Sequence, residues 1–160
     1  MADNTHNDLE KRRDNLQKAA GGCGAVFLLV GILGFIPGVT MHYNTLSWAG
    51  HDSGATLLGI FQVSVLHNIV HLAFGVAGLL MSRTVRGARS FLLGGGVMYA
   101  VVWLYGLVVD QASSANFIPV NTADNWLHFV LAIGMIALGL ALGRRAMPAR
   151  APRSVPHRAH

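Results

Sequence analysis

Two long apolar runs of this chain contain histidines and no other ionisable side chain. His67 and His71 lie in the run Leu57–Met81, and His128 lies in the run Asn125–Gly143. A run of about twenty apolar residues is long enough to span a bilayer. An ionisable group at that depth is costly unless it has a partner or a function. The runs therefore predict a membrane protein, and the histidines mark its candidate site.

Four apolar runs divide the chain. They cover Ala20–Val39, Leu57–Met81, Ser90–Val109 and Asn125–Gly143. Only 12% of the 160 residues are charged, which is too few for an ordinary soluble domain. We therefore expect an all-α integral membrane four-helix bundle over residues 20–143. A cytoplasmic segment over residues 1–19 precedes it, and a basic, disordered cytoplasmic tail over residues 144–160 follows it.

The positions of the basic residues predict the orientation. All twelve lie before the first run, between the second and third, or after the fourth: Lys11, Arg12, Arg13, Lys18, Arg83, Arg86, Arg89, Arg144, Arg145, Arg150, Arg153 and Arg158. Because basic flanks stay on the cytoplasmic side, both termini should be cytoplasmic. The same charges favour contact with anionic headgroups of the inner leaflet. Topology already explains them, so we do not expect a nucleic-acid partner.

Polar residues recur at helical spacing along one face of the second run, and more weakly along the fourth. This polar seam comprises Ser64, His67, Asn68, His71, Asn121, Asp124, Asn125 and His128. We expect both faces to turn towards the inside of the bundle. Asn121, Thr122 or Asp124 can also cap the free amides at the start of the fourth helix.

An Asn-x-x-His motif occurs twice in the seam. Asn68 and His71 form the first copy, and Asn125 and His128 form the second. The two helices that carry the motif should cross the membrane in the same direction. This suggests a duplicated helical hairpin, with its copies related by an axis along the membrane normal.

Glycines indicate where helices approach each other closely. Gly24, Gly31 and Gly38 recur every seven residues, and Gly94–Gly96 lie together in the third run. Such small stripes let membrane helices pack backbone to backbone, within a bundle or against a partner. A homo-oligomer or another membrane partner is therefore an open alternative.

A first interpretation of the histidines is a cofactor site. His67 and His71 are four residues apart, which places two imidazoles on one side of a helix, and His128 could supply a third ligand. Such a set could hold a divalent metal or haem iron. Tyr99 and Trp103 of the third run could flank the group.

Two other interpretations remain open. Imidazoles can relay protons along a polar path, or conduct a small solute. Alternatively, His and Asn side chains can hydrogen-bond across helices and fix the register of the bundle. The last reading leads, and it describes a small structural or accessory membrane protein. No nucleophile beside a base, paired carboxylates or phosphate loop is recognisable, so we do not expect a soluble-type enzyme.

Three strings carry a family resemblance. They are GILGFIPGVT, GIFQVSVLHNIVHLAFGVAGLL (Gly59–Leu80) and NFIPVNTADNWLHFVLAIGMIALGL (Asn116–Leu140). Together they resemble the family of domain of unknown function 4383 over about Ala20–Gly143. The resemblance implies a small multi-pass protein of the bacterial plasma membrane, with four spans and no established activity. It brings no catalytic residue, and its motifs contain the polar seam.

Overall fold

The protein is an all-α bundle of four helices in the part of the chain that the structure describes. This computed structural model describes residues 2–146, and the side chains of residues 7–143. The helices are α1 (Ala2–Leu33), α2 (Val65–Met81), α3 (Val85–Val108) and α4 (Thr122–Ala146). The segments Asn7–Leu33, Val85–Val108 and Thr122–Gly143 are long and apolar enough to cross a membrane, and α2 is a shorter apolar helix. The expected fold class is confirmed.

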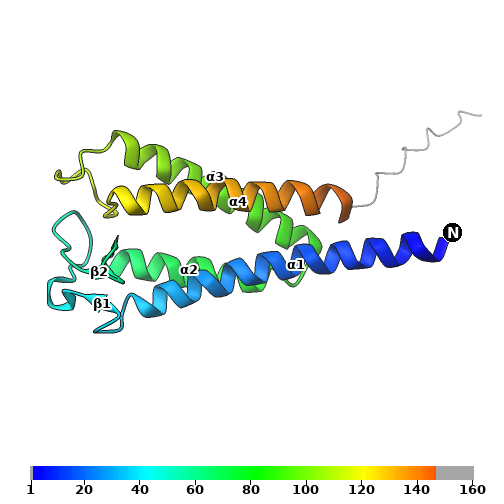
Figure 1. The fold of residues 1–160 in the computed structure, drawn as a ribbon, viewed down its shortest axis with the longest axis horizontal. Coiled ribbons are helices and arrows are strands. Elements are labelled where there is room, and N and C mark those ends of the chain that lie inside the picture. Colours follow the sequence, from blue (N-terminus) through cyan, green and yellow to red (C-terminus); the bar gives the residue numbers. More distant parts are fainter. Residues whose placement is uncertain (1, 147–160) are drawn as a thin grey trace, which may run out of the picture.

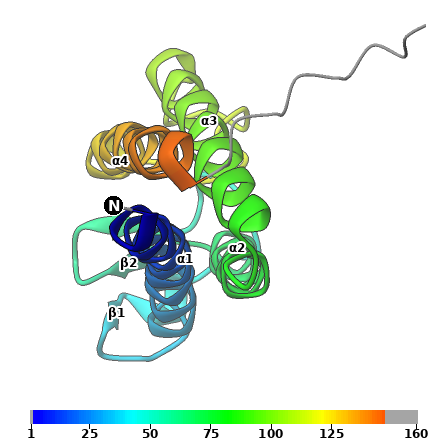
Figure 2. The same cartoon turned by 90° about the vertical axis from the view of Figure 1, so that its right-hand side faces the viewer.

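The helices form two antiparallel hairpins. α1 packs most extensively on α2, and α3 packs most extensively on α4. Figure 2 shows the bundle end-on, with the α1–α2 pair below the α3–α4 pair. The start of α1 and the end of α4 lie at one end of the bundle (Figure 1). This placement of the ends agrees with an even number of crossings.

A small antiparallel sheet covers the opposite end of the bundle (Figure 1). Its strands are β1 (Thr40–Met41), β2 (Thr56–Leu57) and β3 (Phe61–Gln62), in the order β1-β2-β3, and a short 3-10 helix, η1 (Tyr43–Thr45), follows β1. Leu57 pairs with Phe61 across a tight turn. In this turn Leu58 and Gly59 have φ angles of 54° and 73°. A left-handed leucine is strained by its Cβ, so the surrounding contacts must hold it in place.

The apolar run Leu57–Met81 is not helical along its whole length. Its first residues belong to the sheet, and α2 begins only at Val65. The positive φ of Gly59 breaks any helix there. Ser64 then caps α2, because its Oγ accepts a hydrogen bond from the backbone N–H of His67 at 3.1 Å.

The other helices also differ from the apolar runs. α1 begins at Ala2 and includes the polar segment before the first run, and it ends at Leu33. Gly38 therefore lies beyond the helix with a φ of 91°, and its expected place on the helical glycine stripe is wrong. α3 and α4 begin earlier than the third and fourth runs. The end of α4 takes in the first residues of the expected tail, and residues 147–160 of that tail lie outside the described residues.

The helices of each hairpin meet at glycines. A Cβ on Gly24 would lie 2.9 Å from the carbonyl oxygen of Gly75, and a Cβ on Gly96 would lie 3.0 Å from that of Ala132. At Gly22 and Gly94, by contrast, no atom from elsewhere in the described part of the chain lies within 4 Å of the same position. The helix backbones of both hairpins can therefore approach only where the side chain is hydrogen.

The two hairpins repeat each other in space as well as in sequence. Gly24, Phe27 and Gly34 correspond to Gly96, Tyr99 and Gly106, while Ser64, His67, Asn68 and His71 correspond to Asn121, Asp124, Asn125 and His128. Gly34 contacts the side chain of Asn68, and Gly106 contacts that of Asn125. The Phe27 and Tyr99 rings stack on each other between the hairpins, with centroids 5.3 Å apart and planes at 8°. These matching contacts support the duplicated helical hairpin.

This repeat predicts a matched pair of glycine effects. Gly24→Ala and Gly96→Ala should each lower the free energy of unfolding by about 1–3 kcal/mol, because the new methyl group would push two backbones apart. Gly22→Ala and Gly94→Ala should change it by less than about 0.5 kcal/mol. Unfolding of the four variants in detergent micelles would measure the difference. Equal losses at tight and open glycines would contradict this packing.

Candidate functional site

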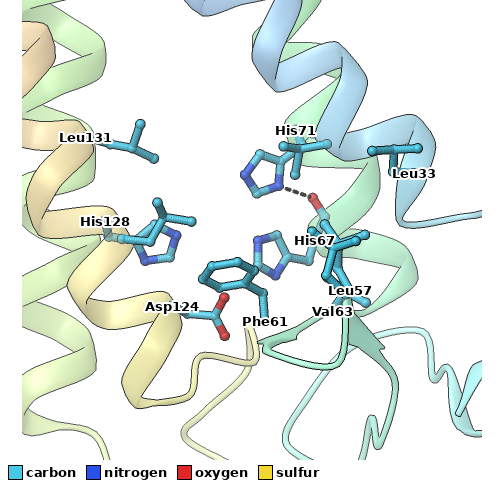
Figure 3. A pocket seen from close by; sticks show the side chains of 12 residues that line it. Leu33, Leu57, Phe61, Val63, His67, His71, Asp124, His128 and Leu131 are labelled. Carbon is cyan, nitrogen blue, oxygen red and sulfur yellow. Dashed lines mark hydrogen bonds between the residues drawn. The ribbon is translucent and has the colours of Figure 1, made fainter. Parts of the chain in front are cut away.

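A pocket of about 120 Å³ lies between the two hairpins at the sheet end of the bundle. Its walls come from α1, α2, α4 and the segment that forms β2 and β3. The polar lining consists of three imidazoles and one carboxylate, those of His67, His71, His128 and Asp124. The remaining lining is apolar: Val30, Leu33, Leu57, Leu58, Phe61, Val63, Leu127 and Leu131. Figure 3 shows His67 and His71 on one wall of this pocket and Asp124 and His128 on the opposite wall.

The α2 wall carries two stacked imidazoles. Their centroids are 4.6 Å apart, and the Nδ1 of His71 donates a hydrogen bond to the backbone oxygen of His67 at 3.1 Å (Figure 3). A carbonyl oxygen can only accept, so the Nδ1 of a neutral His71 carries the proton. The Nε2 of that ring is then left as an acceptor.

Asp124 and Asn121 form a reciprocal cap at the start of α4. The Oδ1 of Asn121 accepts a hydrogen bond from the backbone N–H of Asp124 at 2.9 Å, and the Oδ2 of Asp124 accepts one from that of Asn121 at 3.0 Å. The same Oδ2 accepts a hydrogen bond from the backbone N–H of Gln62, and the side-chain amide of Asn121 donates one to the oxygen of Ile60. Of the three expected candidates, Asn121 is therefore the cap of α4, and Asp124 completes the reciprocal pair. These bonds also fasten the sheet of the first hairpin to the second.

Two buried imidazole nitrogens at the pocket have no hydrogen-bond partner among the described residues. They are the Nδ1 atoms of His67, which is 5% exposed, and of His128, which is 4% exposed. The two rings lie 6.4 Å apart between centroids. A buried polar group without a partner is costly, which makes these atoms a sign of function.

The polar seam divides into two parts. Asn68 and Asn125 do not line the pocket; they fill the spaces left by Gly34 and Gly106 inside each hairpin. The Nδ2 of Asn68 and the Oδ1 of Asn125 have no partner among the described residues. The asparagines thus serve the packing of each hairpin, while the histidines and Asp124 face the space between the hairpins.

An aromatic cluster of Phe27, Phe74, Phe91 and Tyr99 closes the pocket on the side away from the sheet. Phe27 lies 5.9 Å from His71 between ring centroids, and Tyr99 lies 5.4 Å from His128. Phe74 packs edge-on against both Phe27 and Tyr99. On the far side of this cluster from the sheet, the buried residues that the structure describes are mainly apolar, and they include Leu16, Leu92 and Met135. The pocket is therefore closed towards the end of the bundle that holds the N-terminus.

The residues present do not form a ready site for haem or a metal. The pocket has about the size of a cavity that holds a benzene ring, which is too small for a porphyrin. Among the side chains of residues 7–143, no three His, Cys, Asp or Glu groups lie together so that they could hold a metal ion. Of the two expected flanking aromatics, Tyr99 contacts His128, whereas Trp103 packs on Phe129.

Sequence reasoning missed the part of the site that comes from the loop. Leu57, Leu58 and Phe61 were assigned to a helix, yet they roof the pocket. Gln62 was not singled out, yet its backbone N–H holds Asp124. The Leu58-Gly59 pair within an apolar run was the available signal, since glycine there is typical of a turn.

The comparisons with known proteins find one family. A family model described as a domain of unknown function (DUF4383) matches residues 17–141. No curated protein and no solved structure matches the chain.

The cap at Asp124 yields a stability prediction. Asp124→Ala should lower the free energy of unfolding by about 1–3 kcal/mol, because two half-buried backbone N–H groups lose their acceptor. Asp124→Asn should lose less, since its amide oxygen can still accept. Asp52→Ala is the control, because the Asp52 side chain is 82% exposed. Unfolding in micelles measures all three, and equal losses for Asp124→Ala and Asp52→Ala would show that the cap is unimportant.

The closed floor yields an accessibility prediction. In a Cys23→Ala background, the Leu131→Cys variant should react with methyl methanethiosulfonate on the order of tenfold or more faster than the Met135→Cys variant. Leu131 lines the pocket, whereas Met135 is 2% exposed and packs with the core beneath it. Ile133→Cys, on the exposed face of α4, controls for reagent supply. Equally fast reaction at Met135→Cys would mean that the cavity continues through the bundle.

Proposed function

Because the chain belongs to the DUF4383 family of domains of unknown function, we infer its function from its own structure, and we propose that it binds a small ligand in the pocket between its hairpins. The observation that carries this proposal is the pair of unpartnered Nδ1 atoms on His67 and His128 beside a cavity. A ligand that hydrogen-bonds to them would remove the cost of burying them unpaired.

A purely structural role explains the asparagines better than the histidines. Asn68 and Asn125 fit against glycines, so they help to set the distance between helices within each hairpin. The histidines stand at the looser interface between the hairpins. Among the described residues, both asparagines and histidines have unpaired polar atoms, but only the histidines His67 and His128 also line a pocket. Ligand binding therefore accounts for the pocket residues, and packing accounts for the rest of the seam.

A proton or solute conduit is the weaker alternative. A conduit needs polar groups or space along its whole length. The aromatic cluster next to His71 and His128 offers neither among the described residues. A pocket with one open end suits binding rather than passage.

We place the protein in the bacterial plasma membrane with both termini in the cytoplasm, as the basic residues favour. The cytoplasmic end would then contact anionic headgroups of the inner leaflet. The pocket would then lie towards the outer leaflet, because residues of the sheet segment line it. Association with a second copy or another membrane protein stays a prediction.

Phenol is a suitable first probe, since it joins one ring to one hydroxyl group. At ten times its dissociation constant, a ligand that binds only the folded state stabilises it by about 1.4 kcal/mol, or about 3–6 °C in melting temperature. We expect this shift in the unmodified protein and in Ile133→Trp, a lipid-facing control. Leu131→Trp should abolish it, because the indole would fill the pocket.

Phenol also partitions into detergent, and that effect should be the same for the three proteins. The difference between them is therefore the measurement. Melting without phenol shows whether each variant is folded. An equal shift in all three proteins, or no shift in any, would refute ligand binding in this pocket.

A further inference from the structure

The size of the pocket limits its ligand to one ring. A cavity of roughly 150 Å³ accommodates benzene, and drug-sized ligands need about 300 Å³ or more. The volume here is about 120 Å³. A larger molecule could therefore place only a single-ring headgroup inside, with the remainder outside the pocket.

The mouth of the pocket is apolar. The most exposed residues of its lining are Leu58 and Leu127, which are 57% and 39% exposed, so we place the mouth beside them. Val30 and Leu33 of α1 and Leu131 of α4 line the space beside it. Any part of a ligand that leaves through this mouth would run between apolar side chains towards the bilayer, so an alkyl or isoprenoid tail suits it.

The polar groups lie on opposite walls and offer both hydrogen-bonding roles. On the α2 wall, the Nε2 of neutral His71 is an acceptor, and the Nδ1 of His67 has no partner among the described residues. On the α4 wall stand the Nδ1 of His128, also without a partner, and the carboxylate of Asp124 (Figure 3). A ring that carries hydroxyl or carbonyl oxygens can therefore hydrogen-bond to groups on either wall.

We infer that the ligand is a lipid-soluble quinol or quinone with a single ring. This inference rests on the proposed function, and it names the ligand class for the same pocket. The hydroxyl groups of a quinol would donate to imidazole nitrogens and the carboxylate. The carbonyl oxygens of a quinone would accept from N–H groups of His67 and His128, because a neutral imidazole whose tautomer is not fixed by another bond can present its proton on either nitrogen. The tail would leave past Leu58 and Leu127.

Decylplastoquinone and decylbenzene form a matched pair of probes. Both have one ring and the same tail, and only the quinone has oxygens. Native mass spectrometry at fixed detergent concentration would give their apparent dissociation constants for the full-length protein. We expect the quinone to bind at least about tenfold more tightly, as one or two hydrogen bonds from buried imidazoles would require.

Two variants locate the binding. His128→Phe keeps a ring against Tyr99 but removes the nitrogens, and should weaken quinone binding about tenfold without changing that of decylbenzene. His51→Gln is the control, because this histidine lies in the first loop and pairs with Asp52. If His128→Phe does not fold, Leu131→Trp replaces it, and it should abolish binding of both probes.

The outcomes separate the inference from the proposed function. Equal affinity for the two probes, or quinone binding that survives both His128→Phe and Leu131→Trp, would overturn the quinone inference. If neither tailed probe binds while phenol still stabilises the protein, the pocket binds a different class of ligand and the inference falls alone. If phenol also does not stabilise the protein, both the quinone inference and the proposed ligand binding are contradicted. Tight quinone binding that His128→Phe weakens and His51→Gln leaves unchanged would establish the inference.

Discussion

Backbone contact at glycine holds each hairpin together, and the remaining structure follows from it. Gly24 meets the backbone of α2 at Gly75, and Gly96 meets that of α4 at Ala132. In a bilayer the hydrophobic effect does not bring helices together, so close packing at small residues must do so. The hairpins therefore pack tightly inside and more loosely against each other. The pocket lies at this looser interface.

The two copies of the duplicated hairpin differ at one pair of positions in the site, and this difference makes the site asymmetric. The repeated hairpins place equivalent positions opposite each other, and the stacked Phe27 and Tyr99 rings occupy one such pair. His71 and His128 are another pair. Where the first hairpin has His67, the second has Asp124. The site thus combines titratable bases with an acid, although the two copies share their backbone arrangement.

The sequence predicted the architecture well because bilayer packing imposes simple rules. The apolar runs predicted four helices, the glycines predicted close helix contacts, and the Asn-x-x-His motif predicted the repeat. The site was predicted only in part. Asn121 and Asp124 were recognised as a cap through local spacing, but their bonds to Ile60 and Gln62 join distant segments. Helical periodicity carries no information about such contacts.

The roof of the pocket shows the same limit at the level of the backbone. Leu57, Leu58 and Phe61 are as apolar as a membrane helix, so hydropathy assigned them to one. The turn at Leu58 and Gly59 directs them over the pocket instead, and it holds Leu58 in a left-handed conformation. Such strain persists only where neighbouring contacts impose it, and it is common at ligand sites. A roof tied by its backbone to Asp124 therefore couples the shape of the pocket to the residue that supplies its carboxyl group.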